Sequence, residues 1–192
     1  MKLLKNVLSF IGGAVIIGFL FMFIKFDLAT RVNQATDLDP KAMALYMAMA
    51  DNVLTTGDSA KAMIRRVKVD KEISAEDVVD SLNSIATERN LLVVANSLMS
   101  GGKKGGKYIR IISYCNPQIA KEFINHSMAY SAFMPCRVAI VEDDNGSLWL
   151  YTMDLGLMIA GGHTLPPKLL EQAEYIRDTM YSMMDLASKG DF

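Results

Sequence analysis

The chain has 192 residues, of which 20 are basic and 21 acidic, and its net charge is -1. This balance, without a concentrated basic region, excludes the electrostatic footprint of a nucleic-acid-binding protein. Two cysteines are too few for a disulfide scaffold, and they form neither a CxxC pair nor a zinc-type spacing. The length fits one domain plus an appendage.

The appendage is an apolar segment near the N-terminus. Val7 to Ile24 is an uncharged run of 18 residues, preceded by Lys2 and Lys5 and followed by Lys25. A helix of this length spans roughly 27 Å, enough to cross a hydrocarbon core. The run is longer than a usual signal-peptide core and lacks a small-x-small cleavage site, so an anchor is favoured over a signal sequence. We expect a single pass through the cytoplasmic (inner) membrane, with the C-terminal domain in the periplasm.

Three regions are predicted: a membrane anchor over residues 1–30, a helical linker over 31–60 and an α+β domain over 61–192. The linker contains a helix that starts at Asp39-Pro40 and ends near Leu54. Its apolar stripe is predicted to pack inward, and it consists of Met43, Met47, Ala50 and Leu54. Methionines at this spacing are also soft ligands for copper(I), but filler in a packed helix face is the favoured interpretation.

The domain begins with a predicted edge strand over 62–69. A capping box formed by Ser74 and Asp77 then predicts a helix, followed by a buried strand over 91–95. The next loop, over 100–108, matches the start of a phosphate-binding GxxxxGK[ST] pattern. Tyr108 stands where the pattern requires a serine or threonine, and a strand follows in place of a helix. We therefore interpret residues 100–108 as a solvated loop.

A third strand is predicted over 108–115, and Pro117 opens the next helix. Asn145-Gly146 predicts a hairpin with a two-residue turn, which places Ile140 opposite Tyr151 and Cys136 on that same face. A terminal helix follows, with a clear apolar periodicity. Its stripe consists of Leu169, Ala173, Ile176, Met180 and Met183. The fold class is therefore α+β, two-layer, with a mixed β-sheet of about five strands packed by helices and preceded by an N-terminal transmembrane helix.

The two cysteines are candidates for thiol or soft-ligand chemistry. A helical crossover predicts that the strand ending at Cys115 runs parallel to the strand beginning at Cys136, which separates their sulfurs. Cys136 could instead act on copper(I), haem or a sulfur species, with Arg137 lowering its pKa. The further members of this candidate site are Met134, Met153, Met158 and His163. A small buried cysteine is the favoured interpretation.

A second candidate site is an apolar groove beside the short segment over 155–160. Its residues are Trp149, Tyr151, Met153, Leu157 and Met158. The chain has two histidines and no nucleophile elbow, HExxH or GxGxxG motif, which favours a noncatalytic protein without a metal or cofactor. The leading hypothesis is an accessory module that binds a partner protein or an apolar ligand. The sequence leaves a homodimer open.

Several short motifs together resemble the "domain of unknown function 302" family, in its membrane-anchored bacterial form. The resemblance covers roughly residues 64–192. The motifs are Tyr114-Cys115-Asn116-Pro117, Tyr130-Ser131, Phe133-Met134-Pro135-Cys136-Arg137, Gly146-Ser147-Leu148-Trp149-Leu150-Tyr151, Met158-Ile159-Ala160-Gly161-Gly162 and Leu165-Pro166. The resemblance implies a compact α+β fold outside the cytoplasmic membrane, and no established activity.

Overall fold

The computed structural model describes residues 2–102 and 106–191, which form two compact units, Met1–Pro40 and Lys41–Phe192. The first unit contains helices α1 (Lys2–Lys25) and α2 (Leu28–Ala35). Considering only the described residues, no single helix is both long and apolar enough to span a membrane. The pair Ser9–Lys25 and Leu28–Ala35, bent by 64°, qualifies jointly, and a signal sequence would have the same properties.

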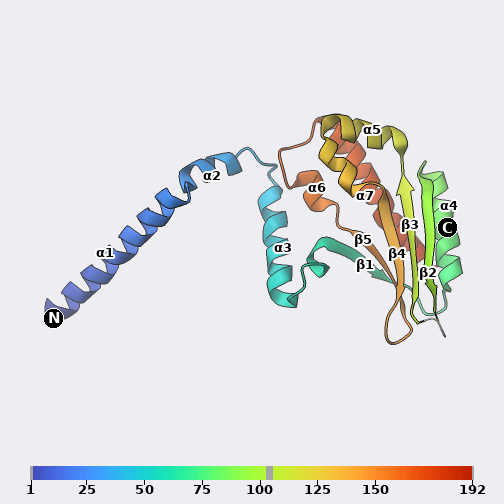
Figure 1. The fold of residues 1–192 in the computed structure, drawn as a ribbon, viewed down its shortest axis with the longest axis horizontal. Coiled ribbons are helices and arrows are strands. Elements are labelled where there is room, and N and C mark those ends of the chain that lie inside the picture. Colours follow the sequence, from blue (N-terminus) through green and yellow to red (C-terminus); the bar gives the residue numbers. More distant parts are fainter. Residues whose placement is uncertain (1, 103–105, 192) are drawn as a thin grey trace. The chain divides into compact units, whose positions relative to one another are not determined.

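The second unit is an α+β domain (Figure 1). Its strands are β1 (Ile64–Lys68), β2 (Leu92–Gly101), β3 (Tyr108–Cys115), β4 (Cys136–Glu142) and β5 (Leu148–Met153). Its α-helices are α3 (Ala42–Thr56), α4 (Ala75–Glu88), α5 (Pro117–His126), α6 (Gly156–Ala160) and α7 (Pro167–Ala187). The 3-10 helices η1 (Lys61–Met63) and η3 (Met128–Phe133) precede β1 and β4.

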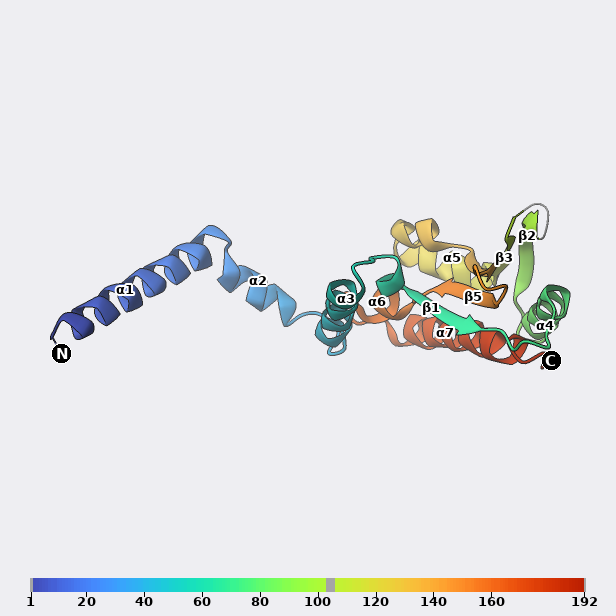
Figure 2. The same ribbon diagram turned by 90° about the horizontal axis from the view of Figure 1, so that it is seen from below.

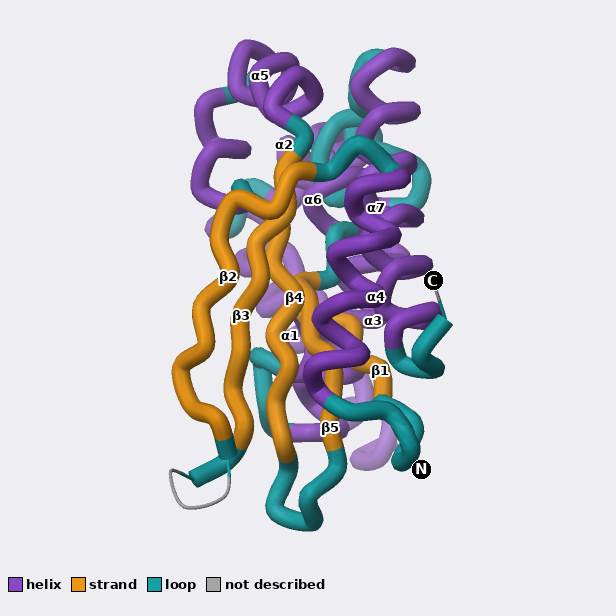
Figure 3. Tube along the Cα trace, turned by 90° about the vertical axis from the view of Figure 1, so that its right-hand side faces the viewer, coloured by secondary structure: helices purple, strands orange, loops and turns teal. Residues whose placement is uncertain are grey.

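The sheet has five strands in the order β1-β5-β4-β3-β2, and every neighbouring pair is antiparallel. The prediction of an α+β fold with about five strands is confirmed, whereas the prediction of a mixed sheet is wrong. The parallel pairing was expected between β3 and β4. Instead α5 leads away from the end of β3 and η3 packs against it on the return, so β4 begins at the end where β3 stops (Figures 1 and 3).

One face of the sheet is covered by α4 and α7 (Figure 2). The main core forms there, around Ile112, Ile140 and Leu150, which are fully buried. The C-terminal half of α7 adds Met180 and Met183 to this core. The predicted stripe of the terminal helix is therefore confirmed as its buried face, because period-3.6 apolar positions share one side of a helix.

Two helix starts follow from their capping residues. Ser74 and Asp77 form the predicted capping box at α4, in which the Ser74 hydroxyl accepts from the Asp77 backbone N–H at 3.2 Å. At α5, Asn116 Oδ1 accepts from the backbone N–H groups of Gln118 and Ile119, both at 3.1 Å. These bonds satisfy N–H groups that have no partner within the helix.

The β4–β5 hairpin has a longer loop than predicted. Asp143 Oδ1 accepts from the backbone N–H groups of Asn145 and Ser147, both at 2.9 Å, so the loop includes five residues, 143–147. Ile140 consequently pairs with Leu150 rather than with Tyr151. A shift of one residue moves a side chain to the other face. The predicted grouping of Cys136 with Tyr151 on one face is therefore wrong.

Two exposed surfaces also differ from prediction. The stripe of α3 expected to pack inward is exposed at Met43, Met47 and Leu54, while Ala42 on another side is buried. The α3 helix lies within the predicted 31–60 linker, and it belongs to the second unit, where it packs against α6. The strand expected to be buried is β2, an exposed edge strand.

We predict that truncating a leucine of the main core will lower the free energy of unfolding much more than truncating an exposed leucine of α3. Leu150→Ala should lower the free energy of unfolding by about 2 to 5 kcal/mol, because it leaves a cavity in the main core. Leu54→Ala, at a side chain that is 85% exposed, should change it by less than about 0.5 kcal/mol. Urea unfolding monitored by circular dichroism measures both values. Equal losses for the two variants would contradict this description of the core.

Candidate functional site

The main candidate site is an apolar crevice beside Phe133, at one end of the sheet. It comprises two adjoining cavities of about 240 and 420 Å³, which share Phe133 and Met153 in their walls. We call them together the Phe133 crevice. The further apolar residues of the larger cavity are Met63, Ala129, Tyr130, Leu157 and Met158. Both the size and the apolar lining are typical of small-molecule sites.

Phe133 is the last residue of η3 and is 43% exposed. Tyr130, also in η3, anchors this helix to α5. Its ring meets that of Phe123 edge-on, with the ring centroids 5.1 Å apart. The Tyr130 hydroxyl lies 3.5 Å from the Met158 carbonyl of α6. Phe133 also borders a third cavity of about 60 Å³. Phe133 therefore lies at the boundary between the smaller cavity, which lies against the sheet, and the larger cavity, which lies against α6.

The opposite wall depends on α6 and on a close backbone approach. A Cβ on Gly161 would overlap the Leu157 carbonyl oxygen, so the turn that ends α6 requires glycine. Ile159 and Ala160 are buried in a second apolar cluster, which includes Leu169 and Ala173 of α7. The position of Leu157 and Met158 in the crevice thus follows from how α6 is packed onto α7.

Two charged residues border the crevice and differ in their pairing. The Asp154 carboxylate accepts from the Gly156 backbone N–H at 2.8 Å and from the Tyr181 hydroxyl at 3.0 Å. Burial, and to a smaller extent Asp154, raises the pKa of Tyr181 to about 12, so this hydroxyl keeps its proton. Arg137, which lines the smaller cavity, is exposed and has no carboxylate partner among the described residues. Among the described residues, Arg137 is thus a cation at the crevice that no carboxylate neutralises.

The residues predicted for an apolar groove fall into two groups. Met153, Leu157 and Met158 line the larger cavity, and Tyr151 lines the smaller one with Met153. Trp149 lies further along β5, where its indole N–H donates to Asp143 at 2.9 Å. Phe133, Tyr130 and Met63 were not among the predicted residues. Phe133 and Tyr130 occur in the motifs that resemble the family, and this was the only signal for them.

The cysteines lie closer together than predicted. Because β3 and β4 are antiparallel, Cys136 pairs with Tyr114, the residue before Cys115. Both cysteines and Met134 line one small cavity of about 40 Å³, and both cysteines are free. Arg137 follows Cys136 in the strand and so projects to the other face. His163 is exposed in the loop after α6 and does not line this cavity.

The environment of the cysteines favours neutral thiols. Burial raises the pKa of Cys115. Burial, and secondly the neighbouring Cys115, raises the pKa of Cys136 to about 11. This direction is opposite to the lowered pKa that was expected from Arg137, and reactive or metal-binding cysteines require the thiolate. Within the described ranges, no three His, Cys, Asp or Glu side chains come together as a metal would require.

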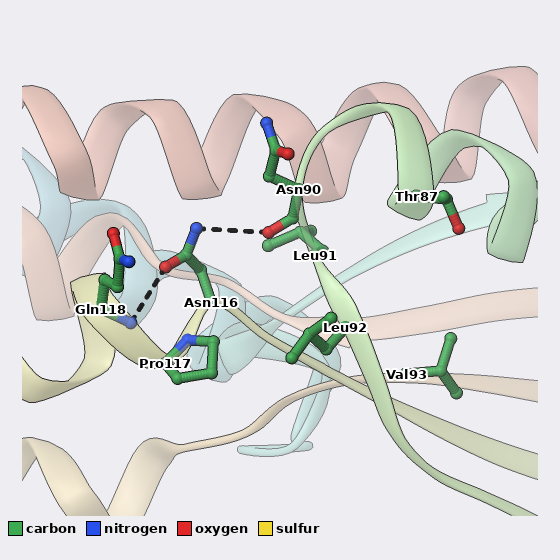
Figure 4. A pocket seen from close by; sticks show the side chains of 8 residues that line it. All are labelled: Thr87, Asn90, Leu91, Leu92, Val93, Asn116, Pro117 and Gln118. Carbon is green, nitrogen blue, oxygen red and sulfur yellow. Dashed lines mark hydrogen bonds between the residues drawn. The ribbon is translucent and has the colours of Figure 1, made fainter.

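A broader depression of about 700 Å³ lies where β2 begins beside the start of α5 (Figure 4). Several of its polar groups are used by the fold itself. The Asn116 amide donates to the Asn90 carbonyl at 3.2 Å and accepts from Gln118, while the Thr87 hydroxyl donates to Asn83 at 2.9 Å. Since these groups already have partners, the depression offers a ligand less than the Phe133 crevice does.

The sheet order, the covering helices and the crevice define a two-layer α+β domain with one open face. The family model described as "Domain of unknown function DUF302" matches residues 65–187. The chain belongs to this family. This confirms the family to which the sequence motifs pointed, and the membrane-anchored form of the family stays a prediction. The family's description gives no activity.

A solved structure supports the same fold. The chain is similar to the uncharacterized conserved protein DUF302 from Bacillus stearothermophilus, with a TM-score of 0.50 and 18% identity. The match covers 64% of this chain and 96% of that chain. At this identity the similarity establishes the fold alone. No curated protein matches the chain.

We predict that Cys136 makes stability depend on pH in the alkaline range. The folded-state pKa of about 11 exceeds the ordinary value of 9.0, so the unfolded chain loses this proton first as the pH rises. The contribution of the Cys136 thiol to the free energy of unfolding should therefore stay constant below pH 9. It should then fall by about 2 to 3 kcal/mol between pH 9 and 11.

Chemical unfolding at stepped pH measures this dependence, with Cys136→Ala as the matched control that removes the titrating group. The variant should show a shallower decline than the parent chain over the same interval. Parallel curves would show that Cys136 has no raised pKa.

Proposed function

We propose that this domain is a noncatalytic binding module that takes an elongated apolar ligand with an anionic end. The single observation that carries the proposal is the Phe133 crevice, whose larger cavity of about 420 Å³ is walled mainly by apolar side chains. Met63, Met153 and Met158 contribute flexible side chains, which adapt to ligands of different shape. Arg137 at the smaller cavity supplies the charge that an anionic end would meet.

The proposal further includes a membrane-anchored protein whose domain faces the periplasm. The uncharged run of residues 7–24 and the bent pair α1–α2 support an anchor. A protein held at a membrane lies next to a supply of amphiphiles with this chemistry. The two parts of the proposal are tested separately.

Thiol-redox or metal handling by Cys115 and Cys136 is the alternative. Antiparallel pairing brings the two residues near each other, which removes the distance objection raised by the sequence. Their raised pKa values nevertheless oppose thiolate chemistry, and His163 does not join them. We therefore place the function in the crevice rather than at the cysteines.

Ligand binding can be tested on a fragment of residues 37–192. Both apolar clusters lie within this range. The Bacillus chain matches over 96% of its own length, so it is little more than the domain, and we expect the fragment to fold alone. The probes are decanoate and decan-1-ol, which share an apolar chain and differ in charge. Isothermal titration calorimetry measures the dissociation constants.

We predict that Phe133→Ala will weaken both probes by about tenfold or more, since a large apolar contact is lost. Arg137→Gln should weaken decanoate by about two- to fivefold and leave decan-1-ol unchanged, because an exposed ion pair contributes little. Met128→Ala is the matched control, an 80% exposed residue of the same η3 helix. Failure of both probes to bind, or equal effects of Phe133→Ala and Met128→Ala, would refute the crevice as the site.

We also predict that the full chain will stay with membranes after carbonate extraction, whereas the fragment of residues 37–192 will be soluble. Protease added outside spheroplasts should digest the domain of the full chain, because the domain is expected on the periplasmic side. Recovery of the domain in the soluble pool with its first residues removed would instead identify a signal sequence.

A further inference from the structure

The outermost strand β2 is exposed along almost its whole length. All residues from Leu92 to Met99 are exposed, and in the part of the chain that the structure describes β2 pairs only with β3 (Figure 3). Four large apolar side chains are at least half exposed: Leu92 at 56%, Val94 at 50%, Leu98 at 52% and Met99 at 67%. An exposed apolar edge strand is a template for pairing with another strand.

The two edges of the sheet differ in a way that makes β2 distinctive. At the other edge, β1 carries Arg65, Arg66 and Lys68 among its five residues. Charged side chains of this kind discourage edge-to-edge pairing. The β2 strand, with the sequence LVVANSLMSG, carries no charge. The sheet is therefore protected at one edge and open at the other.

The pairing pattern within β2 locates the segment best suited to a new partner. Register shifts lie between Val93 and Ala95 and between Leu98 and Ser100, so Ala95 to Leu98 is the regular part. A β-bulge interrupts the regular hydrogen bonding between two strands, so a new partner strand would pair most regularly with this central segment. Asn96 and Ser97 lie at its centre.

We propose that β2 pairs antiparallel with β2 of a second copy of this chain. A two-fold axis beside Asn96 or Ser97 would join the two sheets into one continuous sheet. The argument for a second copy is electrostatic: a two-fold interface brings each residue near the axis against its own copy, so a charge at the centre of the strand would meet a like charge. An uncharged apolar strand has no such repulsion, and it has no charge with which to select a different partner.

This arrangement would satisfy the backbone groups along the free edge of both copies and cover Val94, Leu98 and Met99. A two-fold axis perpendicular to the sheet keeps α4 and α7 of both copies on the same face. The inference does not depend on the Phe133 crevice, which involves η3, α6 and the far part of β5.

The test uses a pair of charge variants at Asn96, an exposed residue near the proposed axis. The fragment of residues 37–192 should be a dimer in sedimentation equilibrium. Asn96→Lys and Asn96→Glu should each raise the dimer dissociation constant by at least about tenfold, because each places two like charges across the axis. An equimolar mixture of the two variants should restore the dimer, since the unlike charges then face each other.

Met128→Lys is the matched control, because it adds the same charge at an exposed residue away from β2 and should leave the dimer intact. Hydrogen exchange of the unmodified fragment provides a second measurement that needs no variant: β2 amides should become better protected as concentration rises. A monomer at all concentrations up to about 200 μM would overturn the proposal. A dimer unaffected by both Asn96 variants would likewise overturn it, by placing the interface elsewhere.

Discussion

The burial of one face of α7 is the interaction on which the rest of the domain depends. Its C-terminal half supplies Met180 and Met183 to the core against β3, β4 and β5. Its N-terminal half supplies Leu169 and Ala173 to the cluster beneath α5 and α6. Ile176 contacts both clusters. One helix therefore joins the sheet to the helical cap, and the cap holds the walls of the Phe133 crevice in place.

The antiparallel pairing of β3 and β4 is the second constraint, because it decides what lies at the end of the sheet. Since α5 and η3 return the chain to the same end, Phe133 and Met153 come to share cavity walls although 20 positions separate them. The same pairing places Cys136 beside the residue that precedes Cys115. In this environment the thiols are neutral, so proximity alone does not make them a redox centre.

The domain also presents surfaces that its own core does not use. The apolar stripe of α3, the crevice and the β2 edge are separate surfaces with different chemistry. Monomeric soluble proteins rarely expose large contiguous apolar patches without a function. The proposed binding role of the crevice and the proposed self-association through β2 together account for two of these surfaces.

The sequence by itself determined those features whose physics is local. The period of Leu169, Ala173 and Met180 identified the buried face of α7, and Ser74 with Asp77 identified the start of α4. Such patterns depend on residues within one or two helical turns. The motifs resembling the family also depend on short segments, so the family and the α+β class were predictable.

Only the tertiary structure decided strand direction, hairpin register and the exposure of β2. Direction depended on how the 20 residues between β3 and β4 travel, and register depended on which N–H groups the Asp143 carboxylate binds. The apolar sequence of β2 indicated burial, because periodicity cannot show whether a strand lies at the centre or the edge of a sheet. The crevice combines residues from η1, η3, β5 and α6, and contacts between elements so distant along the chain leave no local pattern to find.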